Sequence, residues 1–431
     1  MNPTETFPQR AACWLAFGSA VSILFSIAAS QILLALALVA LLLSGAPLRL
    51  PRVKLPLALF LLGTVIAWVF SGNLTAGLPQ IRKIYVFCEL LVVFSAIRDM
   101  RLIRWLFLTW AGFGGIAAGW GLFQFAQKVQ QAQAHDSDRY SFYISERITG
   151  FMSHWNTFSA QEMFALIMLG AFLFFAPGVR KRAIWVACAG LLALAVLLAE
   201  TRAVWIATAV ASLYLIWFWR RWLVLLVPVA IAVAYLASPP VIRERFTSLV
   251  HAKEADSNEF RKVTWRTGLR MIEAHPWLGL GPEGPKYRFE EFVPEDVPHP
   301  RPEGWYGHLH NIYLQYAAER GIPTMLVMMW ILLQILCDFW RGLRSLPPGP
   351  SDRKFLLHGG IAIVLATLTE GLAEYNLGDS EVLTMFLVVV ACGYLALEKD
   401  VAPEWGSPYP AAVERAERPS AESAALKPPA A

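Results

Sequence analysis

The feature that most constrains this chain is a succession of long apolar runs separated by short polar connections. About 20 apolar residues cross the hydrocarbon core of a bilayer as one α-helix, and we count about twelve such runs. Hydrophobic residues make up 56% of the 431 residues and charged residues only 16%, which excludes a soluble globular chain. The sequence therefore predicts an all-α polytopic membrane protein with about twelve transmembrane helices.

The distribution of Lys and Arg predicts the orientation of these helices. Basic residues gather in the connections 46–54, 98–104, 178–182, 220–221 and 341–354, whereas the opposite connections 30–31 and 71–78 contain none. Because basic loops stay in the cytoplasm, both chain ends are expected there and two long hydrophilic connections outside. The expected spans are residues 12–28, 29–45, 55–71, 79–97, 103–127, 157–176, 183–199, 202–219, 222–238, 311–340, 355–374 and 380–397.

This pattern divides the chain into six segments. They are N-terminal membrane helices at 1–128, a first outer loop at 129–156, membrane helices at 157–238, a large outer loop at 239–310, C-terminal membrane helices at 311–398, and a tail at 399–431. The tail is rich in Pro, Ala and Glu and is expected to be disordered. The five cysteines are scattered through apolar runs, so neither a disulfide framework nor a zinc site is indicated.

Ionisable residues beside the spans gather at their expected outer ends. Arg82 and Lys83 open the fourth span, Glu200 and Arg202 occupy a tight outer turn, and carboxylates at 370, 374, 379 and 381 flank the last outer turn. A channel or pump would distribute such groups through the full membrane thickness. The pattern favours chemistry at the outer face, although each residue taken singly is more often a solvated helix end.

The large outer loop contains an amphipathic segment at 259–272. At helical spacing Lys262, Arg266 and Arg270 share one face, whereas Arg261 lies with Trp265, Leu269 and Ile272 on the apolar face. A buried arginine must find an anion or an acceptor, so Arg261 is the sharper candidate for a binding role. Gly279 and Gly281 follow, and a structural turn is favoured there over a phosphate-binding loop.

The loop ends in His308, His310 and Asn311 at the mouth of a membrane helix. Imidazole titrates near neutrality and can accept a proton from a hydroxyl nucleophile. A metal site is not indicated, because no third or fourth ligand accompanies the pair. The alternative is a pair of hydrogen-bonding residues at the membrane interface.

Several motifs of this chain resemble one family. The stretch His-Leu-His-Asn-Ile-Tyr-Leu-Gln at 308–315, with Glu-Arg-Gly-Ile-Pro at 319–323, resembles the His-x-His-Asn signature and following helix of the O-antigen ligase/polymerase superfamily, the Wzy_C domain. The resemblance covers about 140–400. It includes Arg261 and Trp265, the run His-Pro-Trp-Leu-Gly-Leu-Gly at 275–281, the Thr-Arg turn at 201–202, and Arg-Ile-Thr-Gly-Phe at 147–151 with Asn156.

The resemblance implies a GT-C-like membrane fold with short helices in a large periplasmic loop. It implies a glycosyltransferase of the bacterial inner membrane that joins an undecaprenyl-diphosphate-linked glycan to an acceptor hydroxyl at the periplasmic face, without metal or cofactor. His310 is the expected base, His308 its reserve, and Asn311 an orienting residue. The leaving diphosphate needs positive charge, for which the candidates are Arg202, Arg261, Arg147, Arg82, Lys83, Arg266 and Arg288. Asp136 and Asp138 are interpreted as an acidic loop tip rather than a metal motif.

Three acceptors remain open within such a family: lipid A–core oligosaccharide for a ligase, another lipid-linked repeat for a polymerase, and a protein serine for an O-oligosaccharyltransferase. The basic outer loop favours an acceptor that carries core and lipid A phosphates, so the ligase is preferred and the polymerase comes second. A transporter of lipid-linked oligosaccharide is the alternative from a different class. Membrane lipids are expected partners, and nucleic acid is not.

Overall fold

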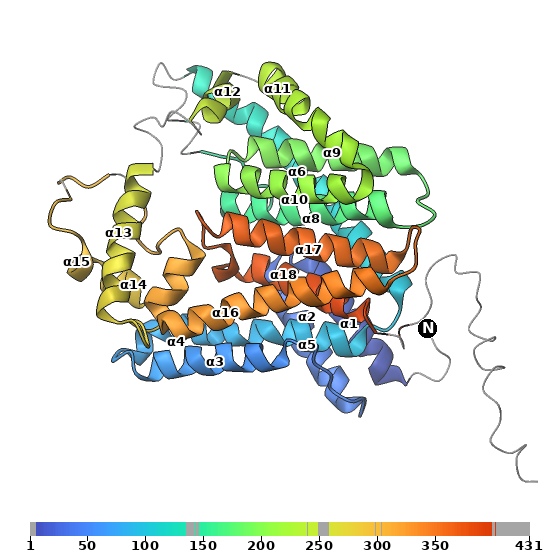
Figure 1. The fold of residues 1–431 in the computed structure, drawn as a ribbon, viewed down its shortest axis with the longest axis horizontal. Helices are drawn as coiled ribbons and strands as arrows, with labels where there is room; N and C mark the ends of the chain where they lie inside the picture. The colour runs from blue at the N-terminus through green and yellow to red at the C-terminus, as the bar shows by residue number, and fades with distance from the viewer. Residues whose placement is uncertain are drawn as a thin grey trace, which may run out of the picture.

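A computed structural model describes residues 6–134, 142, 146–238, 240–248, 258–297, 299–302, 304–398 and 401. Every regular element in this part of the chain is helical (Figure 1), which agrees with the predicted fold class. Four helices are long and apolar enough to cross a membrane: Met100–Gln131, Trp155–Phe175, Arg202–Ala237 and Ile312–Ser345. Four further apolar helices are shorter, so the count of twelve spans stays a prediction.

Ten of the expected spans each correspond to one α-helix. The helices are α1 (Phe7–Ser22), α2 (Ile27–Leu43), α3 (Lys54–Val69), α6 (Met100–Ala134), α8 (Trp155–Phe175), α9 (Arg182–Leu198), α10 (Arg202–Arg220), α16 (Ile312–Ser345), α17 (Asp352–Glu370) and α18 (Ser380–Leu395). The ninth expected span, 222–238, is divided between the 3₁₀ segment η2 (Arg221–Leu226) and α11 (Val227–Ala237).

The fourth expected span, 79–97, is not one continuous α-helix. Its residues belong to the short amphipathic α4 (Leu74–Arg82), the 3₁₀ segment η1 (Lys83–Phe87) and α5 (Cys88–Ala96). Pro79 inside α4 removes one backbone donor, and the tighter 3₁₀ turns mark the break between the two α-helices. The start predicted at residue 79 therefore falls within α4 rather than at the beginning of a membrane helix.

The centre of the bundle is formed by α8, α17 and α18, whose side chains are mostly buried. On α17, Phe355 meets the rings of Phe107 and Phe172 edge-on, at centroid distances of 6.2 and 5.7 Å. Both α10 and α16 pack against α17, and α9 and α6 pack against α8 (Figure 1). Hydrogen bonds join the first residues of α8 and α16 to the turn after α17, and the first residue of α10 to the large loop, so these three helices begin at the end of the bundle where α17 finishes.

Four helices of the large outer loop gather at that end of the bundle (Figure 1): α12 (Pro240–Thr247), α13 (Asn258–Ala274), α14 (Gly284–Tyr287) and α15 (Phe289–Phe292). The buried residues of α13 recur at helical spacing, at positions 260, 263, 264, 267, 268 and 271. Leu269, which the sequence analysis placed on the apolar face, is 50% exposed. It lies nine residues after Phe260, about two and a half turns, and therefore points away from the bundle.

The run 275–281 is held against a kink in α16. Gly321 interrupts α16 with a φ of 79°, and a Cβ there would lie 2.0 Å from the carbonyl oxygen of Trp277. A Cβ on Gly279 would lie 2.4 Å from the carbonyl carbon of Glu319. The backbone N–H of Leu280 donates to the Ala318 carbonyl at 2.8 Å. These glycines permit close backbone approach, which agrees with the interpretation of this run as a structural turn.

The expected orientation can be tested by labelling. In a background with the five cysteines replaced by Ala, we expect Glu273→Cys and Asp296→Cys to react with a membrane-impermeant thiol reagent added from the periplasm. Both positions are exposed on the outer loop. Ser345→Cys, exposed at the far end of α16, should react only after the membrane is permeabilised. The reverse pattern would invert the assignment of the two faces.

Candidate functional site

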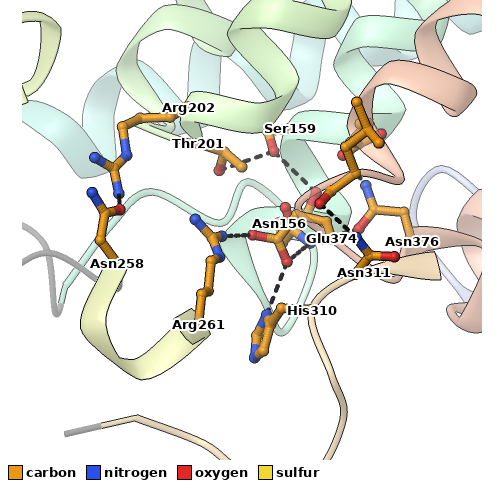
Figure 2. A network of polar contacts seen from close by, with 12 residues as sticks. Asn156, Ser159, Thr201, Arg202, Asn258, Arg261, His310, Asn311, Glu374 and Asn376 are labelled. Carbon is orange, nitrogen blue, oxygen red and sulfur yellow. Dashed lines mark hydrogen bonds and ion pairs between the residues drawn. The ribbon is translucent and has the colours of Figure 1, made fainter. Parts of the chain in front are cut away.

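Glu374, in the turn after α17, joins a histidine and an arginine from the outer loop (Figure 2). Its Oε2 lies 3.2 Å from Nδ1 of His310, and its Oε1 accepts a hydrogen bond from the guanidinium of Arg261 on α13. All three side chains are largely buried, at 16% exposure or less. One carboxylate therefore connects three segments that are distant in the sequence.

The segment that carries His310 is anchored on both sides. Leu309 is fully buried beneath α13, where a Cβ on Gly268 would lie only 2.6 Å from a Leu309 methyl group. Asn311 is the N-cap of α16: its Oδ1 accepts from the backbone N–H groups of Tyr313 and Leu314, each at 3.0 Å, while its Nδ2 donates to the Leu372 carbonyl at 2.9 Å. Asn311 therefore acts here by fixing the backbone next to His310.

The hydrogen bonds of the two histidines assign them different protonation patterns. Burial raises the pKa of the Glu374 carboxyl, but Arg261 and His310 lower it further, to about 2. Glu374 is thus ionised at neutral pH and can only accept, so Nδ1 of His310 is the donor. The Nε2 atom of His310 is buried and has no hydrogen-bond partner among the described residues. In the neutral imidazole this nitrogen carries the lone pair.

His308 lies beside His310, with ring centroids 4.0 Å apart, but it is engaged differently. Its Nδ1 accepts the backbone N–H of His310 at 3.2 Å. Burial lowers the pKa of His308 to about 3, and His310 contributes to the decrease. The neutral ring must therefore carry its proton on Nε2 and has no lone pair left for another proton. This arrangement favours His310 over His308 as a base.

Arg202, the first residue of α10, is buried at 7% exposure. It donates to the Ser248 carbonyl at 2.8 Å and to Oδ1 of Asn258 at 2.5 Å (Figure 2). These bonds tie α10 to the segment after α12 and to the start of α13. Arg202 thus lies where the membrane bundle meets the outer loop.

Arg147 extends the cationic surroundings of the site. Its guanidinium lies 5.0 Å from the Trp155 ring centroid, and its Nε is buried without a hydrogen-bond partner among the described residues. Burial lowers the pKa of Arg147, Arg245 lowers it further, and Glu200 opposes both. Burial raises the pKa of Glu200 itself to about 7. The neighbourhood therefore contains more positive than negative charge, which suits an anionic ligand.

A polar network from α8 and the last outer turn borders Glu374 (Figure 2). Asn156 donates to Asn376 at 2.6 Å, and Thr157 donates to Asp379 at 2.9 Å. Lys83 reaches the same turn, where its ammonium donates to the Gly378 carbonyl at 2.7 Å. Hydrogen bonds from α8 and from Lys83 thus hold the turn that carries the Glu374 carboxylate.

The remaining sequence candidates lie elsewhere. Arg266 forms an exposed pair with Asp296, with donor distances of 2.7 and 2.9 Å, and Arg288 pairs with Glu291 at the surface. Arg82 is exposed. The structure does not bring these three into the hydrogen-bonded group around Glu374: Arg266 lies on the exposed side of α13, and Arg288 lies between α14 and α15, where it pairs with Glu291.

Asp136 and Asp138, the acidic pair in the first outer loop, fall outside the residues that the structure describes. Within the described ranges, no group of three or more His, Cys, Asp and Glu residues is arranged to hold a metal ion.

Sequence reasoning assigned no role to three residues of this site: Glu374, Arg245 and His154. Glu374 was visible as one of four outer carboxylates, but nothing local links it to a histidine 64 residues earlier. Arg245 is buried at 2% exposure and donates to the Glu200 carbonyl at 3.1 Å. His154 is the N-cap of α8. In the sequence, only the clustering of charged residues at one expected membrane face indicated that such residues could share a site.

The central ion pair can be tested by stability. Glu374→Gln removes the charge that Arg261 requires, so we expect a loss of about 1–3 kcal/mol of unfolding free energy, seen as a lower melting temperature in detergent. Asp296→Asn, which breaks the exposed pair with Arg266, should change it little. In an Arg261→Gln background the effect of Glu374→Gln should shrink. Additive effects would show that the two side chains do not interact.

Comparison with known proteins adds a family to this geometry. Residues 187–329 match the Wzy_C family model, described as O-antigen ligase. The matched region contains Arg202, Arg261, His308 and His310, while Glu374 lies beyond it. No match was found among curated proteins. The similarity of residues 187–329 to the Wzy_C family supports membership of this chain in the O-antigen ligase/polymerase superfamily.

Proposed function

We propose that this protein is an O-antigen ligase. It would transfer O-antigen polysaccharide from undecaprenyl diphosphate to a hydroxyl of lipid A–core oligosaccharide at the periplasmic face of the inner membrane. The observation that carries the proposal is the His310–Glu374 pair. It leaves one imidazole nitrogen of His310 without a hydrogen-bond partner among the described residues, beside buried arginines. His310 lies within the region that matches the Wzy_C family model.

The proposed reaction assigns one proton and one leaving group. The acceptor hydroxyl oxygen forms a bond to the anomeric carbon of the donor sugar while the bond from that carbon to the diphosphate oxygen breaks. The hydroxyl proton passes to Nε2 of His310. Glu374 holds the opposite nitrogen of the ring and stabilises the imidazolium that forms, as a carboxylate does for a histidine base.

The leaving diphosphate departs as an anion, so it requires positive charge rather than a proton. Arg147 and Arg261 each have a buried Nε without a hydrogen-bond partner among the described residues, and Arg202 lies nearby at the start of α10. We assign the diphosphate to these three arginines. Arg82, Arg266 and Arg288 stay weaker candidates because they lie outside the group around Glu374, and Lys83 because its ammonium donates to the Gly378 carbonyl.

The identity of the acceptor is the most specific part of the proposal. A ligase, a polymerase and a protein O-oligosaccharyltransferase would share the donor and the base, and differ in which hydroxyl reaches His310. Residues 243–301 contain ten Lys and Arg residues, which would contact phosphates on the acceptor, beside ten Asp and Glu residues. A transporter of lipid-linked oligosaccharide would need no base at all, so loss of function in a histidine variant that still binds donor argues against it.

The role of His310 can be tested in a strain that lacks the wild-type gene. We expect wild type to restore polymer-capped lipopolysaccharide on gels, whereas His310→Ala and His310→Gln should leave the lipid-linked polymer unused. A positioned base contributes about 10²–10⁴-fold, and Gln can hydrogen-bond but cannot take up a proton at neutral pH. Protein abundance in the membrane should stay unchanged.

The same variants separate the alternatives in vitro, with purified protein, lipid-linked donor and lipid A–core acceptor in excess EDTA. Wild type should transfer glycan and both variants should fail. Turnover by His310→Gln near the wild-type rate would reduce the imidazole to a positioning group. Loss of wild-type activity in EDTA would return attention to Asp136 and Asp138. In cells, caps of a single repeat without functional protein would indicate a polymerase instead.

The arginines can be tested by a change of shape at constant charge. Arg202→Lys and Arg261→Lys keep the charge but lose the planar fork that binds a diphosphate through two donors. We expect each to lower the transfer rate by about tenfold or more. Arg266→Ala, in an exposed pair with Asp296, should stay within about twofold of wild type. If Arg266→Ala were as damaging as Arg261→Lys, the division of α13 into a working face and a surface face would be wrong.

A further inference from the structure

An open groove of about 610 Å³ lies between the ends of four helices. Its walls are aromatic: Phe174 stacks on Trp219 at 4.3 Å between centroids, and Phe218 meets Trp340 edge-on at 5.4 Å. Trp340 is 38% exposed and Phe218 is 42% exposed. Large aromatic side chains thus present accessible apolar surface within the groove.

Three cations line this groove: Arg220, Arg344 and Lys354. No carboxylate is among its lining residues. Two acidic residues lie close to the lining residues along the chain. Asp352 is fully buried and paired with Arg104 at 3.1 Å, and Asp338 accepts a hydrogen bond from the Tyr394 hydroxyl at 2.9 Å. Within the part of the chain that the structure describes, Arg220 and Arg344 form no ion pair, and Lys354 donates to the Gly349 carbonyl at 2.7 Å. The groove therefore holds positive charge that no neighbouring carboxylate balances.

The position of the groove relates it to the bilayer. It is built from the last residues of α8, α10 and α16 and the first turn of α17. The opposite ends of these same helices border His310 and Glu374. α8 is 21 residues long, which corresponds to about 30 Å, the thickness of a hydrocarbon core. The connection between α16 and α17 lies at the end of the bundle away from α13 (Figure 1). The groove thus lies at the level of the other membrane interface.

We propose that this groove binds an anionic phospholipid. The phosphate would lie against Arg220, Arg344 and Lys354, and the acyl chains would follow the aromatic walls toward the hydrocarbon. Charge complementarity requires an anion, and exposed aromatic rings at interface depth require an amphiphile rather than a soluble phosphate. The positive connections that form the groove are those expected in the cytoplasm, where anionic lipids attract basic residues. The inference does not depend on the transferase reaction.

Native mass spectrometry of the full-length, delipidated protein tests this proposal. We expect phosphatidylglycerol to bind and raise the melting temperature, and phosphatidylethanolamine to bind at least about tenfold more weakly. The double variant Arg344→Gln/Lys354→Gln should lose about tenfold in affinity for phosphatidylglycerol while its phosphatidylethanolamine binding is unchanged.

The matched control is Arg10→Gln/Arg180→Gln, which removes the same charge at exposed positions outside the groove and should bind phosphatidylglycerol as wild type does. An equal loss in this control would reduce the effect to net charge and overturn the site. Glycerol 3-phosphate that binds wild type as tightly as the lipid would show a free-phosphate site instead. If phosphatidylglycerol bound only after residues 402–431 had been removed, the tail of the chain would be the occupant of the groove, and the lipid proposal would be wrong.

Discussion

The ion pair between Arg261 and Glu374 joins the outer loop to the membrane bundle at the point where the candidate chemistry lies. Removing either side chain would leave the other charge buried without its ionic partner. The same carboxylate also holds His310, so the position of the candidate base depends on the contact that docks α13. Docking of α13 on the bundle and the position of His310 therefore depend on the same carboxylate. A loop that was detached from the bundle would carry His310 without its carboxylate.

Two residues near this contact adopt backbone conformations that non-glycine residues rarely adopt. His310 has a φ of 47° and Glu200 a φ of 54°. Such conformations cost about 1–3 kcal/mol each and persist where the surroundings over-determine them. For His310 these surroundings are the buried Leu309 on one side and the Asn311 cap of α16 on the other. The strained backbone at His310 is thus part of the arrangement that directs its imidazole toward Glu374.

The sequence predicted the helical fold because hydropathy is a local property, and ten expected spans each correspond to one α-helix. It also pointed to His310, Arg202 and Arg261, since their motifs are contiguous. It could not pair Glu374 with His310, because that contact depends on how α17 packs beside α16. The helical spacing placed Arg266 on the charged face, away from Arg261, but it could not identify its partner Asp296, which lies 30 residues later in the loop. Local patterns identified reactive residue types, whereas tertiary packing decided their partners.

The two histidines of the motif illustrate how packing separates chemically identical groups. Both rings lie just before α16. The Nδ1 atom of His308 accepts a hydrogen bond from a backbone N–H, whereas Nε2 of His310 has no hydrogen-bond partner among the described residues. Burial keeps His308 neutral, so it adds no charge that would repel an imidazolium at His310. His308 thus contributes by fixing the backbone of its neighbour and by staying uncharged. A proton that reaches this pair has one nitrogen to occupy, and that nitrogen is the one opposite Glu374.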